Sequence, residues 1–259
     1  MSKLSRIFCY PIKGFTGQEL ERVDVTEMQP LPNDRVHALL RPNSDLDCSP
    51  PTWAHKSKFV MLMKDEVLAA YTTHLDEATA VLRVYCEDEL LLDTDLRNEQ
   101  GRRRFERFVY EVLGAPDGQA LPKLISAQEP SPAHFMDKPD NVISLINLES
   151  VREVSDAIGM ELDPMRFRAN FYIDNLTAWQ EFDWVGSTIS IGAATFRVDR
   201  RNARCAATDV NPRTAARDIK LPSTLRRLYG HTDLGVYLIA TSTATVQVED
   251  SVEPPRSRK

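Results

Sequence analysis

The 259-residue chain lacks the short motifs that most often identify an enzyme class. It has no G-x-G-x-x-G and no G-x-x-x-x-G-K-[ST] stretch, the glycine-rich loops that hold the phosphates of dinucleotides and nucleotides. It also has no G-x-S-x-G nucleophile elbow and no H-E-x-x-H zinc-binding helix. The sequence therefore does not indicate a nucleotide-binding enzyme of these types, an α/β-hydrolase or a zinc protease.

Cysteines are few and widely separated, and long apolar runs are absent. The four cysteines form no C-x-x-C pair and have no zinc-finger spacing; they are Cys9, Cys48, Cys86 and Cys205. Free thiols in a reducing compartment explain this pattern most simply. No apolar run approaches the roughly 20 residues of a membrane helix, and the first residues lack the apolar segment of a signal peptide. We therefore expect a cytoplasmic protein that does not bind membranes.

The chain also has no excess of lysine and arginine over aspartate and glutamate. The net charge is -6 and the isoelectric point is near 5.5, which argues against general nucleic-acid binding. A hydrophobic content of 42% and a charged content of 27% are typical of a globular protein. The length allows one large domain or two smaller ones.

One segment departs from this acidic average. Arg200, Arg201 and Arg204 lie within the five residues before Cys205, and residues 197–217 hold six arginines against two acids. Nearby positive charge favours the thiolate, the form of cysteine that attacks or binds metal. The segment therefore indicates a site for a soft, anionic ligand. A buried structural cysteine beside a solvated basic loop is the alternative.

The periodicity predicts many short strands and three helices. A helix over 96–113 is indicated because four apolar residues fall at i, i+3, i+4 and i+7. A second helix begins at Asn147 or at Ser150, which forms a capping box with Glu153, and ends at Gly159. A third helix covers 221–229. Strands are expected over 5–12, 19–28, 35–41, 58–63, 68–73, 80–85, 90–92, 141–146, 167–173, 188–198, 205–210, 234–240 and 245–248.

These elements predict a β-rich α+β protein, because strands and helices do not alternate as in a doubly wound sheet. A β-barrel or sandwich decorated by helices is expected. Residues 42–52 form a loop by composition, and the Pro-rich stretch 128–140 is the best linker or active-site loop. The five histidines are isolated from one another, and only His134, in that Pro-rich stretch, is a candidate for a site.

Four short segments carry the remaining polar signals. Residues 10–14 end a strand with a lysine, residues 33–35 open a strand with an arginine, and residues 200–208 hold the cysteine. In residues 166–170, alternation along a strand would put Arg166, Arg168 and Asn170 on one face. Such a set of donors suits a phosphate or a polar heterocycle. A solvated strand face is the alternative.

In this order, the segments resemble the MOSC family, the molybdenum cofactor sulfurase C-terminal domain with its preceding β-barrel domain. The resemblance covers nearly the whole chain, and the expected division is 1–122 for the N-terminal β-barrel-like domain and 123–256 for the MOSC domain. The motifs are YPIKG at 10–14, NDR at 33–35, RFRAN at 166–170, W-x-E-x-x-W at 179–184, RCAATDVNP at 204–212 and GVY at 235–237.

The resemblance implies a molybdenum–molybdopterin cofactor with Cys205 as the metal ligand and catalytic residue, as in the amidoxime-reducing component and its bacterial relatives. A thiolate is a soft ligand suited to molybdenum held by dithiolene sulfurs. Pyridoxal phosphate binding is a further expectation from the family. The positions implied to contact the cofactor are Lys13, Gly14, Arg35, Asn141, Arg168, Asn170, Ala203, Arg204 and Tyr237.

The chain departs from the family pattern at three places. Gly14 replaces a serine that follows the lysine, Ala203 replaces a serine two residues before the cysteine, and Glu249-Asp250 replaces a Gly-Asp turn. No cysteine follows Cys205, so a C-terminal plant-type ferredoxin domain is not expected.

These features lead to three hypotheses. In the first, the protein reduces an N-oxygenated small molecule with electrons from a separate ferredoxin- or flavodoxin-like donor. In the second, it carries the cofactor, or sulfur as a Cys205 persulfide, to an accepting enzyme. In the third, it is a binding module that kept the fold and lost the chemistry.

Overall fold

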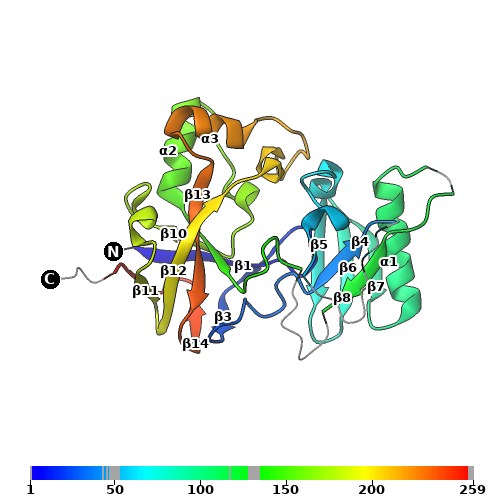
Figure 1. The fold of residues 1–259 in the computed structure, drawn as a ribbon. Coiled ribbons are helices and arrows are strands. Elements are labelled where there is room, and N and C mark those ends of the chain that lie inside the picture. The colour runs from blue at the N-terminus through cyan, green and yellow to red at the C-terminus, as the bar shows by residue number, and fades with distance from the viewer. Residues whose placement is uncertain are drawn as a thin grey trace.

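The computed structural model describes residues 2–42, 44, 46, 53–116, 118–127 and 135–255. Cys48, His134 and the last residues of the chain lie outside the described residues. Two bodies stand next to each other (Figure 1). The large body contains an eight-stranded sheet with two helices, and the small body contains two small sheets and one helix. The expected β-rich α+β fold is confirmed.

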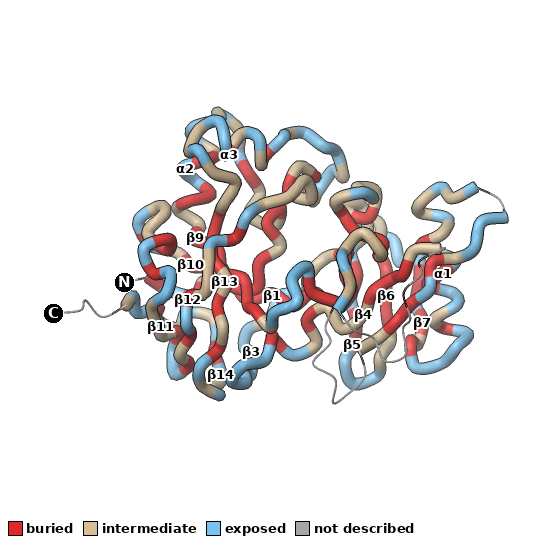
Figure 2. The backbone as a smooth tube through the Cα atoms, viewed as in Figure 1, coloured by how far each residue is buried: buried red, intermediate tan, exposed pale blue. Residues whose placement is uncertain are grey.

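The eight-stranded sheet of the large body has the strand order β15-β11-β12-β13-β9-β10-β1-β2. Strands β9 and β10 run parallel, and the other neighbours are antiparallel. Buried strand residues line its core (Figure 2). The strands are β1 (Lys3–Cys9), β2 (Gln18–Leu20), β9 (Ile143–Asn147), β10 (Phe171–Asp174), β11 (Thr188–Ile191), β12 (Ala194–Ala203), β13 (Asp233–Ala240) and β15 (Val252–Glu253).

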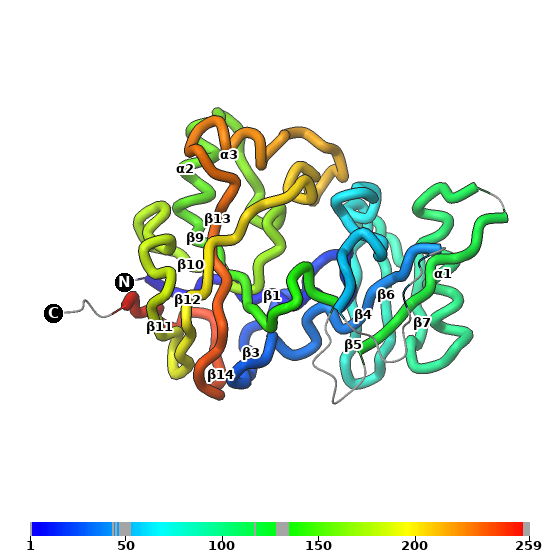
Figure 3. Tube along the Cα trace, viewed as in Figure 1, coloured from blue at the N-terminus to red at the C-terminus, as the bar shows by residue number. Residues whose placement is uncertain are grey.

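Residues from both ends of the chain build the large body. Figure 3 shows the N-terminal β1 among strands from the second half of the chain, and β3 (Arg22–Val25) beside β14 (Ala244–Gln247). Leu4, Ile7 and Val23 pack in one core with Ile143 and Val236. The division at residues 122 and 123 stays a prediction, but residues 3–25 share a sheet system with residues 143–253.

The small body has its own apolar core. The antiparallel pair β4 (His37–Leu40) and β8 (Lys123–Ser126) lies near the three-stranded sheet of β5 (Tyr71–Asp76), β6 (Val81–Cys86) and β7 (Glu89–Asp95). Helix α1 (Glu99–Val112) buries Phe105 and Val109 in this core. This is the face that the helical period predicts. Phe15, from the segment after β1, packs against Phe105 with tilted rings and 5.5 Å between ring centroids.

The helices follow the expected pattern, with one change at a cap. Helix α3 (Leu221–Tyr229) has the predicted bounds, and α2 (Leu148–Ile158) ends at Gly159 in the left-handed region. Asn147 caps α2, because its side chain accepts a hydrogen bond from the backbone of Glu149 at 3.1 Å. The predicted capping box of Ser150 and Glu153 does not form, since the Ser150 hydroxyl donates to the buried Glu181 carboxylate at 2.9 Å.

Two expected strands near the site, 58–63 and 205–210, are wrong, and the expected strand 167–173 begins only at Phe171, as β10. Residues 58–63 contain a turn after the 3₁₀ helix Lys56–Lys58, and residues 206–209 form the 3₁₀ helix Ala206–Asp209. Residues 164–167 form a third 3₁₀ helix, and Arg168 follows it in the left-handed conformation with φ +50°. Short apolar runs fit a strand or a turn equally well, and tertiary contacts decide between them. Arg166, Arg168 and Asn170 therefore do not share a strand face.

Candidate functional site

A cavity of about 550 Å³ is lined by residues from both bodies. Its walls include the segment after β1, the segment around the 3₁₀ helix Lys56–Lys58, and the end of β12. The structure brings eight of the ten predicted site residues to this cavity. They are Lys13, Gly14, Arg35, Arg168, Ala203, Arg204, Cys205 and Tyr237.

Asn170 and Asn141 do not line the cavity. The side chain of Asn170 is buried, accepts a hydrogen bond from Ser144 Oγ at 2.8 Å, and donates to the carbonyl of Phe8 at 3.2 Å. It therefore ties β1 to β9, while Ser144 itself lines the cavity. Asn141 donates to the carbonyl of Met28 at 3.2 Å. The geometry does not support a cofactor contact for either asparagine.

The backbone around Cys205 is held by local hydrogen bonds. Cys205 follows β12 and precedes the 3₁₀ helix Ala206–Asp209. Its carbonyl accepts from the backbone N–H of Thr208 at 3.0 Å and from Thr208 Oγ1 at 2.9 Å. The N–H of Arg204 donates to the carbonyl of Thr232 at 2.9 Å. Cys205 is half-buried, so its sulfur lies at the cavity wall.

The arginines just before Cys205 mostly point elsewhere. Arg200 forms ion pairs with Asp140 at 2.5 Å and with Asp199, and neither Arg200 nor Arg201 lines the cavity. The guanidinium of Arg201 lies over the ring of Phe182, 4.2 Å from its centroid. Of the three arginines just before Cys205 that were expected to surround it, only Arg204 lines the cavity. Side chains that are distant in sequence supply the positive charge instead.

Arg204, the residue before Cys205, is hydrogen-bonded to backbone carbonyls of two other segments of the cavity wall. Its Nε donates to the carbonyl of Leu234 at 2.7 Å, and its Nη1 donates to the carbonyl of Phe167 at 3.2 Å. The amide of Asn202, oriented to suit its neighbours, accepts from Arg204 at 3.2 Å and donates to the Tyr237 hydroxyl at 3.0 Å. Because carbonyls occupy most of its donors, Arg204 holds the loop rather than offering a free charge.

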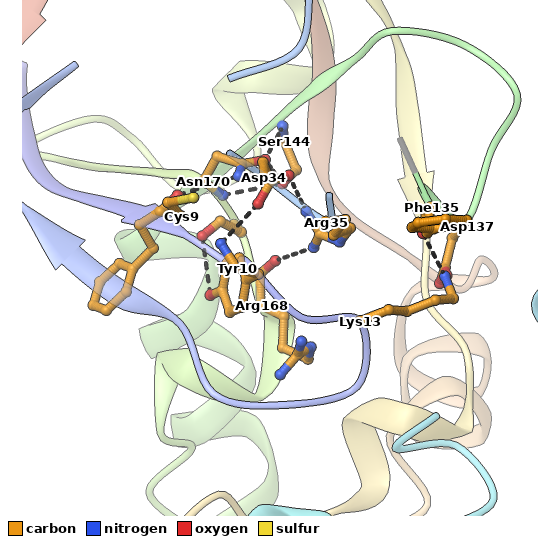
Figure 4. Close-up of polar contacts among 12 residues, drawn as sticks. Cys9, Tyr10, Lys13, Asp34, Arg35, Phe135, Asp137, Ser144, Arg168 and Asn170 are labelled. Atoms are coloured by element: carbon orange, nitrogen blue, oxygen red, sulfur yellow. Dashed lines mark hydrogen bonds and ion pairs between the residues drawn. The ribbon is translucent and has the colours of Figure 1, made fainter. Parts of the chain in front are cut away.

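Lys13 is a deeply buried cation of the cavity, with 4% of its side chain exposed. Its Nζ donates to the carbonyl of Phe135 at 2.9 Å and to the Asp137 carboxylate (Figure 4). Burial lowers the pKa of Lys13, and the Asp137 carboxylate opposes this effect. Gly14 follows with φ +90°, and a Cβ there would lie 3.2 Å from the Val60 carbonyl oxygen. This tight backbone turn explains the glycine at the position where the family pattern has a serine.

Arg35 and Arg168 both lie against the ring of Tyr10, with guanidinium carbons 4.9 and 4.6 Å from its centroid. Arg35 pairs with Asp34 and donates through Nη2 to the carbonyl of Arg168 at 3.3 Å. Among the described residues, no acceptor lies within hydrogen-bonding distance of the Arg168 guanidinium. Figure 4 shows that guanidinium pointing away from the network of dashed contacts. Arg168 is thus available to an anionic ligand.

Lys56 and Asp137 are site residues that the sequence did not single out. Lys56 lies within electrostatic reach of the Cys205 sulfur, and its Nζ is 3.8 Å from Asp137 Oδ2. Burial would lower the pKa of Lys56, but Asp137 and Cys205 raise it above its usual value. Partial removal from solvent inside the cavity would raise the pKa of Asp137, but Lys13 and Lys56 hold it well below its usual range. Neither residue stands in a motif, so only the fold reveals them.

The donor set suits an anionic group that brings its own metal. Within the described ranges, no cluster of three or more His, Cys, Asp or Glu side chains could hold a bare metal ion. One thiol, two buried or half-buried lysines and four arginines, Arg35 and Arg168 among them, instead line one cavity. A thiolate binds a soft metal, while the cations bind phosphate oxygens. The residues present therefore fit a phosphorylated cofactor whose metal takes a single protein ligand.

Comparisons with known proteins find two family models along the chain. The family model "MOSC N-terminal beta barrel domain" matches residues 1–127, and "MOSC domain" matches residues 132–253. The molybdenum cofactor sulfurase of Drosophila melanogaster is 31% identical over 106 residues, which are 40% of this chain and 13% of that protein. The Drosophila willistoni protein of the same name is 32% identical over 110 residues, or 42% and 13%. The matched region is thus a small part of these relatives.

Two solved structures are more distant. The YUAD protein from Bacillus subtilis covers 100% of this chain and 98% of its own, with a TM-score of 0.45 and 12% identity. YiiM from Geobacillus stearothermophilus covers 44% and 54%, with a TM-score of 0.36 and 15% identity. In the described part of the chain, no helix has the length and apolar character to span a membrane. The two family models together account for nearly the whole chain, which belongs to the family of proteins that join a MOSC N-terminal β-barrel domain to a MOSC domain.

Proposed function

We propose that this protein is an oxidoreductase that binds a molybdenum–molybdopterin cofactor and reduces N-oxygenated small molecules. The observation that carries the proposal is the meeting of the Cys205 thiol with Lys13, Arg35 and Arg168 in one cavity. Reduction of an N-hydroxylated substrate to an amine and water consumes two electrons and two protons. A separate ferredoxin- or flavodoxin-like protein would supply the electrons, and a cytoplasmic location is part of the proposal.

Each side chain has a distinct part in holding the cofactor. Cys205 would be the protein's ligand to molybdenum, and Lys13, Arg35 and Arg168 would bind phosphate oxygens. Tyr237, hydrogen-bonded to the amide of Asn202, would form the wall next to the metal. When bound, the cofactor supplies two-electron redox chemistry, while the protein supplies binding, orientation and charge.

The alternative function is transfer of the cofactor, or of sulfur, to an accepting enzyme. The observation that favours it is the similarity to proteins named molybdenum cofactor sulfurase. A Cys205 thiolate beside Lys56 would suit a persulfide as well as a metal. Pyridoxal phosphate binding stays a prediction, because no feature of the cavity distinguishes it from other phosphates.

Molybdenum retention tests the proposal. The protein purified from a host that makes molybdopterin should carry about one molybdenum per chain, since one thiol is the expected ligand. Cys205→Ser should lose most of this metal, while Cys86→Ser, on β6 of the small body and not at the cavity wall, should keep it. Metal analysis checks both variants. Full molybdenum and full reductase activity in Cys205→Ser would overturn the assignment.

Intact-mass analysis separates the two functions. A sulfur adduct on Cys205, removed by a thiol reductant and present without molybdenum, would favour the carrier. Molybdenum together with electron-dependent reduction of a hydroxylamine or an amidoxime would favour the oxidoreductase.

A further inference from the structure

A carboxylate stands inside the cationic cavity. Asp137 is on the segment that leads into β9, and its Oδ1 is paired with Lys13 Nζ while its Oδ2 is 3.8 Å from Lys56 Nζ. Its side chain is 48% exposed, so solvent reaches it from the cavity mouth. The carboxylate therefore bridges two ammonium groups that an anionic ligand would need.

The contacts of the neighbouring residues hold Asp137 in this place. The N–H of Phe135 donates to the carbonyl of Arg35 at 2.7 Å, and the carbonyl of Phe135 accepts from Lys13. On the other side, the indole N–H of Trp53 donates to the carbonyl of Met136 at 3.3 Å. Residues 135–137 thus lie across Lys13 and Arg35, two of the cations of the cavity.

With Asp137 in place, the positive charges of Lys13, Lys56 and Arg168 outnumber the single negative charge of the carboxylate. One carboxylate faces Lys13 and Lys56, and Arg168 adds a guanidinium without an acceptor among the described residues. A singly charged anion that displaced Asp137 would only replace one negative charge by another. A group with two or more negative charges would satisfy both lysines and Arg168 together, and so would gain more than it displaces.

We propose that Asp137 determines the specificity of the cavity by occupying the place of an anionic group of the ligand, so that only a multiply charged anion displaces it from Lys13 and Lys56. A phosphate ester or a diphosphate is the chemical class that fits. The inference rests on the proposed function only in that the cavity receives an anionic ligand.

Binding of inorganic pyrophosphate, measured by calorimetry on full-length protein from a host without molybdopterin, tests the proposal. Asp137→Asn keeps the shape of the side chain and removes its charge, so it should bind pyrophosphate about tenfold more tightly. Such a gain corresponds to a wild-type site that is open about one-tenth of the time. Acetate should compete with pyrophosphate in Asp137→Asn and should not compete in the wild type.

Asp140→Asn is the matched control. Asp140 lies on the same segment with the same 48% side-chain exposure, and it pairs with Arg200 rather than with a cation of the cavity. Asp140→Asn should bind pyrophosphate as the wild type does. Asp137→Asn that binds no tighter than Asp140→Asn, or does not bind at all, would overturn the proposal.

Displacement of Asp137 can also be observed in the wild type. Saturating pyrophosphate should change the fluorescence of Trp53, because moving Asp137 disturbs its neighbour Met136. Trp53→Phe should remove that change. Unchanged emission at saturation would overturn the displacement without any variant at Asp137. The molybdenum test of Cys205 is independent of these measurements, so a failure of the specificity proposal and a failure of the proposed function are distinguishable.

Discussion

Lys56 and Asp137 control the charge that the Cys205 sulfur meets. The Lys56 ammonium lies within reach of the sulfur, and at 3.8 Å it also faces the Asp137 carboxylate. The Cys205 sulfur and the Asp137 carboxylate therefore share one cation. If a ligand displaced Asp137, its own negative charges would replace the carboxylate at both Lys13 and Lys56, and Lys56 would stay beside the sulfur.

The reactivity of Cys205 should depend on Lys56. Lys56→Met keeps the length of the side chain and removes its charge, so alkylation of Cys205 by iodoacetamide at pH 7 should slow about three- to tenfold, because nearby cations favour the reactive thiolate. Mass spectrometry of the Cys205 peptide measures this rate separately from the other cysteines. Lys64→Met, at an exposed lysine outside the cavity, should leave the rate unchanged. Equal rates in both variants would contradict the role of Lys56.

At the scale of secondary structure, β13 sets the distance between the sheet and the cysteine loop. Gly235 on β13 has φ +75°, and a Cβ there would lie 2.3 Å from the carbonyl oxygen of Leu145 on β9. The neighbouring Leu234 carbonyl accepts from Arg204, and Tyr237 two residues on faces the cavity. The glycine therefore allows β13 and β9 to approach closely next to the residues that hold Cys205.

Gly235→Ala should destabilise the fold and loosen the site. Gly186 is the control, because it has a similar φ of +84° but no atom within 4 Å of a built Cβ. The backbone strain is shared, so Gly235→Ala should lower the free energy of unfolding by about 1–3 kcal/mol more than Gly186→Ala. Urea denaturation of both variants measures the difference. An equal loss in the two variants would show that the close approach does not matter.

At the scale of the whole molecule, the cavity depends on how the two bodies meet. Arg217, between β12 and α3, donates to the carbonyl of Ala206 at 3.0 Å in the large body. It also donates to the carbonyl of Met63 at 2.8 Å and to the Glu66 carboxylate at 2.9 Å. Both residues lie between Leu62 and Leu68, which pack in the core of the small body. One guanidinium thus joins the loop after Cys205 to the segment that follows Lys56.

Arg217→Met should loosen this junction. Hydrogen exchange of the amides near residues 63–66 and 205–209 should accelerate, and global stability should fall by about 1 kcal/mol or less, as for other partly exposed ion pairs. Arg213→Met is the control, because Arg213 is 80% exposed and pairs with Asp163 within the large body. Unchanged hydrogen exchange in Arg217→Met would show that Arg217 does not hold the two segments together. Equal acceleration in both variants would show that the effect is not specific to Arg217.

Much of the site could be predicted because its motifs contain unusual residue combinations. Lys13, Arg35, Arg168 and Cys205 stand in short segments whose order resembles the family, and the structure places all four at one cavity. Lys56 and Asp137 could not be found in this way, since a lysine and an aspartate in irregular segments resemble solvated charges. Arg200 is expected beside Cys205 from the basic run, but it does not line the cavity. The basic run in the sequence does not reveal that Arg200 forms ion pairs with Asp140 and Asp199.

The β-rich fold class, the three helices with their apolar faces, and the family follow from the order of the amino acids, because periodicity and motif order are local properties of the chain. The set of cations around Cys205 depends on the tertiary fold, since the cavity forms where segments from residues 13 to 237 converge. The tertiary fold also decides that residues 164–168 and 206–209 turn rather than extend. Besides their local hydrogen bonds, these turns accept bonds from distant residues, such as that from Arg35 to the carbonyl of Arg168 and that from Arg217 to the carbonyl of Ala206, which exist only in the folded chain.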